Sequence, residues 1–258
     1  MENICLNTKE NRSMMLQCML DFSELLLLFG GEVSRVEDSL RRIGNAYGIE
    51  KTDIFVITEN ILLTISYNDG TILSGSRRIS STASYDFEKI DKLNALSREI
   101  CSCPIEPKEL LKRLEQIKEL PQSPFFRYFG NFFVAFGFAL YYGGSFYDAL
   151  ISGLFGFLIA LLQRKTQDFF PNGVTFSFFA SFVVGIFTCL ITNNTNLSRA
   201  MIMIGDIMPL IPGTAITLSL RDILVGDTVS GILKLIECVL IAGGIASGFM
   251  IAIMLVGA

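Results

Sequence analysis

The pattern of apolar and polar positions divides the chain near residue 125. Before that point, short apolar segments alternate with polar and charged residues, as in a water-soluble domain. After it, apolar stretches follow one another, each long enough to cross a bilayer, which takes roughly 20 residues. We predict membrane-spanning helices at about 126–143, 147–163, 173–192, 200–220 and 230–257.

The charged residues follow the same division. Residues 1–125 hold 15 of the 21 Lys and Arg and 19 of the 25 Asp and Glu, and residues 126–258 hold 6 of each class. We therefore predict an α+β soluble domain at 1–125, followed by an all-α transmembrane bundle of about five helices at 126–258. The soluble half carries more acidic than basic residues, so nothing in it indicates a nucleic acid as a partner.

Local signals predict the elements of the soluble half. Apolar residues at helical spacing predict a helix at 10–29 that ends at Gly30-Gly31. Ser34, with Glu37 three residues later, predicts a capping box at the start of a second helix. Two strands rich in β-branched residues follow, and Asn68-Asp69-Gly70 predicts a tight hairpin turn into a third. Two further helices are predicted near 86–101 and 107–119.

The basic residues of the short loops predict the orientation in the membrane. Arg164-Lys165 lie between the second and third predicted spans, and Arg221 and Lys234 flank the connection of the last two. The intervening loops carry only Arg199. Because cytoplasmic loops are enriched in Lys and Arg, we expect a cytoplasmic N-terminus and an external C-terminus in the cell membrane. The first residues show no signal-peptide pattern.

The fourth predicted span is interrupted. It carries a carboxylate, Asp206, and two helix-breaking sites, Pro209 and Pro212-Gly213. Inside a bilayer, a break survives only where protein or a water-filled cavity satisfies the freed backbone groups. We therefore predict a broken fourth helix that lines a transporter binding site. The alternative is a proline-kinked helix in which Asp206 makes a packing hydrogen bond.

The break has chemistry that suits a carboxylate ligand. Pro212 suits the first turn of a helix, so a half-helix is expected to begin there. Its free N–H groups and dipole attract an anion, and two hydroxyls lie close by. Asp206 could meet a substrate ammonium or carry a proton. The residues that we predict to bind substrate are Asp206, Pro212, Gly213, Thr214 and Thr217.

Four other carboxylates are candidates for coupling or gating. Asp222 and Asp227 follow the fourth span, near its predicted inner mouth. Glu237 lies in the last span and could instead pair with Lys234, three residues earlier. Asp148 opens the second span and could instead cap it.

Several classes of enzyme are excluded by residues that the sequence lacks. The chain contains no histidine, which excludes a histidine base, a Ser-His-Asp triad and histidine-ligated zinc. It contains no P-loop and no G-x-S-x-G motif. The six cysteines do not form a metal-binding pattern. We expect no enzymatic activity, no cofactor and no metal.

The chain resembles the threonine/serine exporter family over nearly its whole length. The similarity rests on the run GGEVSRVEDSLRRIGNAYGI followed by DIFVITENILLTI, on Ser76-Arg77-Arg78-Ile79, and on Pro209, Pro212-Gly213, Arg221-Asp222, Gly226-Asp227 and Ser230-Gly231. The resemblance implies export of threonine and serine, or of a dicarboxylate such as succinate. It carries over Pro212, Gly213, Asp222, Asp227 and Gly231 as matching positions.

The resemblance also implies a partner. Fused members of the family have about ten spans, so this chain looks like the larger, YjjP-like subunit of a split pair. The expected partner is a small co-encoded membrane subunit (YjjB-like), or a second copy of the chain. A subunit with five spans ends on the side of the membrane opposite to its start, so this chain and a related partner would be arranged as inverted repeats.

Two other functions remain open from the residues alone. The chain could be a membrane-anchored metabolite sensor or regulatory subunit, or a membrane-bound hydrolase. The broken helix favours a transporter over an anchored sensor, since an anchor needs no break. The missing histidine and the missing nucleophile motif argue against a hydrolase.

Overall fold

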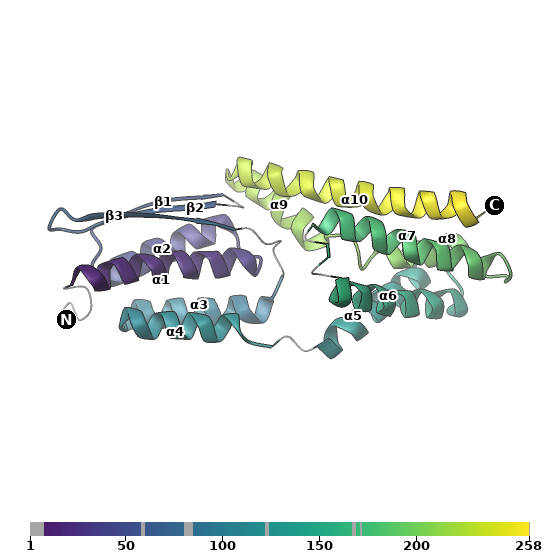
Figure 1. Cartoon of the computed structure of the whole chain (residues 1–258), viewed down its shortest axis with the longest axis horizontal. Helices are drawn as coiled ribbons and strands as arrows, with labels where there is room; N and C mark the ends of the chain where they lie inside the picture. Colours follow the sequence, from purple (N-terminus) through teal and green to yellow (C-terminus); the bar gives the residue numbers. More distant parts are fainter. Residues whose placement is uncertain are drawn as a thin grey trace. The chain divides into compact units, whose positions relative to one another are not determined.

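The computed structural model describes residues 8–57, 60–79, 85–121, 124–166, 169–170 and 172–257. It divides into two compact units (Figure 1). The first comprises Met1–Pro121 and Leu218–Leu233, and the second comprises Gln122–Thr217 and Lys234–Ala258. The sequence pattern did not predict that Leu218–Leu233 groups with the N-terminal segment. Residues 1–7, where a signal peptide would begin, lie outside the described residues.

The first unit contains helices and one antiparallel sheet with the strand order β1-β2-β3. Its N-terminal elements are α1 (Lys9–Leu28), α2 (Val33–Ala46), β1 (Lys51–Ile57), β2 (Asn60–Ser66), β3 (Ile72–Arg78), α3 (Phe87–Ser102) and α4 (Pro107–Lys118). The sheet, the pair α1 and α2, and the pair α3 and α4 form successive layers in Figure 1. Alternate residues of β2, namely Ile61, Leu63 and Ile65, are buried in the core, as the two-residue period of a strand requires.

The predicted capping box of α2 is wrong. The helix begins at Val33, and Glu32 is its N-cap residue without a side-chain cap hydrogen bond. The chain turns sharply at Gly30, whose φ of 89° favours glycine, and α2 follows almost directly. The carboxylate of Glu32 pairs instead with the guanidinium of Arg221.

The predicted hairpin turn between β2 and β3 is confirmed. The two strands pair from Asn60↔Arg78 to Ser66↔Ile72. Asp69 accepts a hydrogen bond from Arg12 of α1 at 2.5 Å and another from the backbone N–H of Thr71 at 3.0 Å. The hydrogen bond from Arg12 lowers the pKa of Asp69 to about 2. The turn is thereby tied to the first helix.

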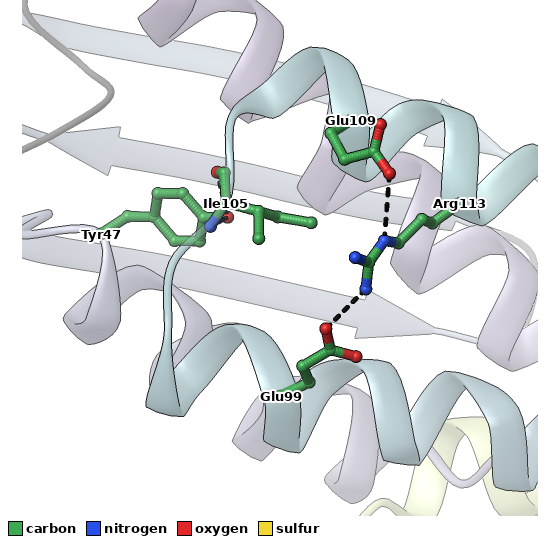
Figure 2. A network of polar contacts seen from close by, with 5 residues as sticks. All are labelled: Tyr47, Glu99, Ile105, Glu109 and Arg113. Atoms are coloured by element: carbon green, nitrogen blue, oxygen red, sulfur yellow. Dashed lines mark hydrogen bonds and ion pairs between the residues drawn. The ribbon is translucent and has the colours of Figure 1, made fainter.

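A polar network joins α3 to α4 (Figure 2). The hydroxyl of Tyr47 donates to the carbonyl of Ile105 at 2.8 Å and accepts from its N–H at 3.3 Å. Arg113 of α4 donates to Glu99 of α3 at 2.6 Å and to Glu109 at 3.2 Å. The tyrosine thus satisfies the backbone of the loop that connects the two helices.

All the regular elements that the structure describes in the C-terminal part of the chain are helices. Its helices are α5 (Pro124–Tyr141), α6 (Phe146–Thr166), α7 (Gly173–Thr192), α8 (Arg199–Ile207), α9 (Gly213–Val225) and α10 (Thr228–Val256). The predicted fold class, an α+β N-terminal part followed by an all-helical part with a broken fourth helix, is confirmed.

Three helices of the described residues are long and apolar enough to cross a membrane, namely α6, α7 and α10. The other two predicted spans correspond to α5 and to the pair α8 and α9. Two polar residues in its first two turns, Arg127 and Asn131, make α5 less apolar, and the fourth span consists of two short helices. Five spans therefore stay a prediction.

Small residues allow α7 and α10 to approach closely. A Cβ atom on Gly248 would overlap the hydroxyl of Ser181, and one on Gly185 would lie 2.8 Å from the Cβ of Ala252. Such close contacts are typical of helices that pack within membranes.

We expect Tyr47→Phe to destabilise the α3–α4 connection more than Arg113→Ala. Phenylalanine leaves the N–H and the carbonyl of Ile105 without their partner, which costs about 1–3 kcal/mol. Arg113 makes solvent-exposed ion pairs, whose loss costs little. Amide hydrogen exchange of the full-length protein should be faster around Ser102–Leu110 in Tyr47→Phe only. Equal loss of protection in both variants would contradict this assignment.

Candidate functional site

The break in the fourth helix lies between Ile207, the last residue of α8, and Gly213, the first of α9. The chain turns there through short-range hydrogen bonds, from the N–H of Leu210 to the carbonyl of Ile207 at 2.9 Å and from the N–H of Gly213 to the carbonyl of Ile211 at 2.9 Å. Prolines at 209 and 212 have no N–H to continue a helix through this turn. The predicted discontinuity is therefore present.

Asp206 lies in the last turn of α8 and is 0 % exposed. Its Oδ1 atom is 2.8 Å from the hydroxyl oxygen of Ser152 on α6. The same hydroxyl is 3.2 Å from the backbone carbonyl oxygen of Ala135 on α5. The other carboxyl oxygen, Oδ2, has no hydrogen-bond partner among the described residues. Three helices thus meet at one buried carboxyl group.

This meeting point depends on residues without bulky side chains. A Cβ atom on Gly205 would overlap the hydroxyl of Ser152 and would lie 2.6 Å from the carbonyl oxygen of Ala135. A Cβ atom on Gly156 would lie 2.8 Å from the Cβ of Ala135. The backbones of α5, α6 and α8 therefore approach closely, and this approach brings Ser152 within reach of Asp206.

The start of α9 is open. Gly213 and Thr214 are exposed and Pro212 is half-buried. A Cβ atom on Gly213 would meet nothing within 4 Å, so the glycine is not required by local packing. The hydroxyl of Thr217 donates to the carbonyl of Gly213 at 3.0 Å, within its own helix. Among the described residues, no hydrogen bond joins this helix start to Asp206.

Asp148 caps α6, which is the alternative that the sequence left open. Its Oδ2 atom accepts from the N–H of Ser145 at 2.8 Å and from the Ser145 hydroxyl at 2.7 Å, and that hydroxyl accepts from the N–H of Asp148 at 3.2 Å. Its Oδ1 atom accepts from the N–H of Ser198 at 2.8 Å. This one carboxylate therefore joins the first turn of α6 to the start of α8.

Arg199 joins the other helix ends near the start of α8. It donates to the hydroxyl of Thr192 at 3.1 Å, to the side-chain oxygen of Asn193 at 2.5 Å and to the carbonyl of Gly257 at 2.9 Å. Asn193 also donates to the carbonyl of Val256 at 2.8 Å. The ends of α7 and α10 are thereby connected to α8, the helix that carries Asp206.

Asp222 and Asp227 belong to the first compact unit, whereas Asp206 belongs to the second. Asp222 is buried in α9. Asp227 precedes α10 and accepts the N–H of Gly231 through its backbone carbonyl at 3.0 Å. Burial raises the pKa of Glu37 on α2, and the nearby charge of Asp227 adds to this effect. The coupling role predicted for the two aspartates stays a prediction.

The remaining predicted positions lie on α10. Glu237 is exposed. Gly231 allows α10 to approach α9, because a Cβ atom there would lie 2.6 Å from a side-chain carbon of Ile223 and 2.7 Å from the carbonyl oxygen of Ser219. A packing requirement explains this glycine.

Sequence reasoning missed Ser152. The signal was present as a row of small residues at helical spacing on one face of α6, all of them buried: Ala149, Ser152, Gly153, Gly156 and Ala160. A hydroxyl within such a row is a candidate partner for a carboxylate on a neighbouring helix. No group of three or more Cys, Asp or Glu residues in the described part of the chain could hold a metal ion.

Comparison with known proteins gives one consistent result. Residues 17–256 match the family model described as "ThrE: Putative threonine/serine exporter". The chain is 24 % identical over 242 residues to the "Threonine/serine exporter" of Corynebacterium glutamicum. That alignment covers 90 % of this chain and 49 % of the relative, so the chain spans about half of the relative's length. No solved structure matches. Because the family model covers most of the chain, this protein belongs to the ThrE family of threonine/serine exporters.

Proposed function

We propose that the chain is a subunit of a secondary transporter that exports small amino acids such as threonine and serine, or a dicarboxylate such as succinate. The observation that carries the proposal is a fully buried carboxyl group, that of Asp206. It lies one residue before the end of α8, where the fourth predicted span is broken. Family membership supports transport rather than catalysis. A metabolite sensor would need neither the break nor a buried acid in its membrane part.

The start of α9 is the proposed binding place for a substrate carboxylate. Its exposed Gly213 and Thr214 leave room for a ligand, and the N-terminus of a helix attracts an anion. Amino acids and dicarboxylates both carry a carboxylate, so this subsite serves either class. An amino acid also carries an ammonium group, which a dicarboxylate lacks. Competition between threonine and succinate in the export assay would therefore identify the class.

The transporter is proposed to contain a second membrane component. The chain spans about half of the relative's length, and three of its described helices are long and apolar enough to cross a membrane. We propose that a small, purely membrane subunit of the YjjB type, or a second copy of this chain, completes the translocation path, with the two halves related as inverted repeats.

The orientation follows from the loop charges. Arg164 and Lys165 in the last turn of α6, together with Arg221 and Lys234, predict the cytoplasmic side. Reporter fusions after Leu120, Gln167 and Ala258 should read inside, inside and outside. A cytoplasmic reporter at Ala258 would exclude both an odd number of spans and the inverted arrangement.

Substitutions at the break should separate transport from folding. We expect Asp206→Asn, Pro212→Ala and Gly213→Leu each to reduce efflux per molecule at least about tenfold, equivalent to about 1.4 kcal/mol in the rate-limiting step. Asparagine removes the acid, and the other two substitutions favour a continuous helix across the break. Export of threonine and succinate from cells, normalised to protein in the membrane, measures the effect.

Two variants serve as controls for this series. Ser247→Ala removes a hydroxyl of α10 that donates to its own helix, at Gly243, and should leave efflux unchanged. Asp148→Ala removes a cap worth about 1 kcal/mol and should lower abundance while efflux per molecule is retained. Normal efflux in Asp206→Asn would show that this acid is a packing group. Normal efflux in Gly213→Leu would exclude the start of α9 as the substrate site.

Assembly can be tested directly. We expect the chain purified in mild detergent to be larger than a monomer, or to export only when the small membrane subunit is co-expressed. Mass photometry and reconstitution into vesicles, with and without that subunit, provide the measurement. A monomer that transports alone at the full rate would contradict the two-component proposal.

A further inference from the structure

The hydroxyl of Ser152 lies between two oxygen atoms and has one hydrogen to donate. One neighbour is Oδ1 of Asp206 at 2.8 Å, and the other is the backbone carbonyl oxygen of Ala135 at 3.2 Å. A carbonyl oxygen can only accept, so the protonation state of Asp206 decides whether each of the two contacts has a hydrogen of its own.

With an ionised Asp206, both neighbours of the hydroxyl are acceptors. The single hydrogen then serves one of them or is shared weakly between the two, so at least one contact is poorly satisfied. With a proton on Oδ1, the carboxyl group donates to Ser152, and Ser152 donates to the carbonyl of Ala135. The acid is the stronger donor, which fits the shorter distance of 2.8 Å between Asp206 and Ser152. Both contacts of the hydroxyl are then hydrogen bonds.

No cation among the described residues pairs with Asp206 to stabilise its ionised form. The helix that carries Asp206, α8, packs against α5, α6 and α7. The only hydrogen-bond partner of the Asp206 side chain among the described residues is Ser152. The charged groups on those four helices are Arg127, Asp148, Arg164, Lys165, Arg199 and Asp206 itself.

The described partners of these charged groups lie elsewhere. Asp148 binds Ser145 and Ser198, Arg164 donates to the hydroxyl of Tyr128, and Arg199 binds the ends of α7 and α10. None of the described ion pairs includes Asp206. A buried charge without a partner is costly, whereas a neutral acid with one unbonded carbonyl oxygen is much less so.

We propose that Asp206 is a proton-binding residue: in this conformation its carboxyl group is neutral and donates to Ser152, the positioning residue that passes the hydrogen bond on to Ala135. The inference rests on the proposed function in one respect: the proposed function places Asp206 at the transport site. Asp206 exchanges its proton with water in another conformation. A substrate ammonium can pair with it only after that proton has left.

Infrared spectroscopy of the full chain, reconstituted with its partner subunit if one is required, tests the protonation state independently of transport. A protonated carboxyl group has a carbonyl stretch apart from the amide bands, and this stretch shifts in D₂O. We expect such a band at neutral pH in the wild type and its loss in Asp206→Asn. The amide of asparagine still donates to Ser152, so the fold should be retained.

Substitution of the serine tests the positioning role. Ser152→Ala should shift the carbonyl band, because the acid loses its acceptor. Ser181→Ala is the matched control, since Ser181 is equally buried and donates to the carbonyl of Ser177 on its own helix at 2.7 Å. That variant should leave the band in place.

The outcomes separate this inference from the proposed function. A spectrum without the band at neutral pH, or with a band that survives in Asp206→Asn, would overturn the assignment of the proton. A band that is unchanged in Ser152→Ala would overturn the role of the serine. If the band behaves as expected while Asp206→Asn exports normally, the inference holds and the transport role of Asp206 fails. If the band is absent and Asp206→Asn does not export, the transport role of Asp206 holds and the assignment of the proton fails.

Discussion

The membrane part of this protein depends on one constraint, the burial of a carboxyl group away from the solvent-exposed surface. Asp206 is 0 % exposed, and its one hydrogen-bond partner among the described residues is a serine on another helix. For that serine to reach it, the backbones of α5, α6 and α8 must come within contact distance, which explains the absence of a side chain at Gly205 and Gly156. The need to bring Ser152 within reach of Asp206 thus accounts for glycine at these two positions.

The helix α8 is held more firmly than the segment that follows it. Its first residues are fixed by Asp148 and Arg199, which connect it to α6, α7 and α10. Its other end leads into the turn at 208–212 and the exposed start of α9. Well-bonded ends favour a single arrangement, whereas few contacts and exposed backbone favour local opening. The break is therefore the part of this region best suited to respond to a ligand.

Features set by neighbours in the sequence were predictable, and features set by distant neighbours were not. Proline chemistry predicted the break, and Asn68-Asp69-Gly70 predicted the hairpin, because both depend on local backbone geometry. The partner of Asp206 lies 54 residues away, and nothing local selects Ser152 from the other hydroxyls. The capping box at Ser34 failed for a related reason. Glu32 occupies the N-cap position without a side-chain cap hydrogen bond, and its side chain pairs with Arg221, 189 residues away.

In the proposed transporter, the charge state of Asp206 would also affect which ligand its surroundings favour. With a neutral acid, the dominant electrostatic feature near the break is the positive end of the α9 dipole, which attracts a carboxylate. With an ionised acid, the same region gains a negative charge that repels a second carboxylate and attracts an ammonium group. A zwitterion suits the ionised state, and a dianion suits the neutral one. If the proposed proton binding at Asp206 holds, the choice between an amino acid and a dicarboxylate would follow the same equilibrium.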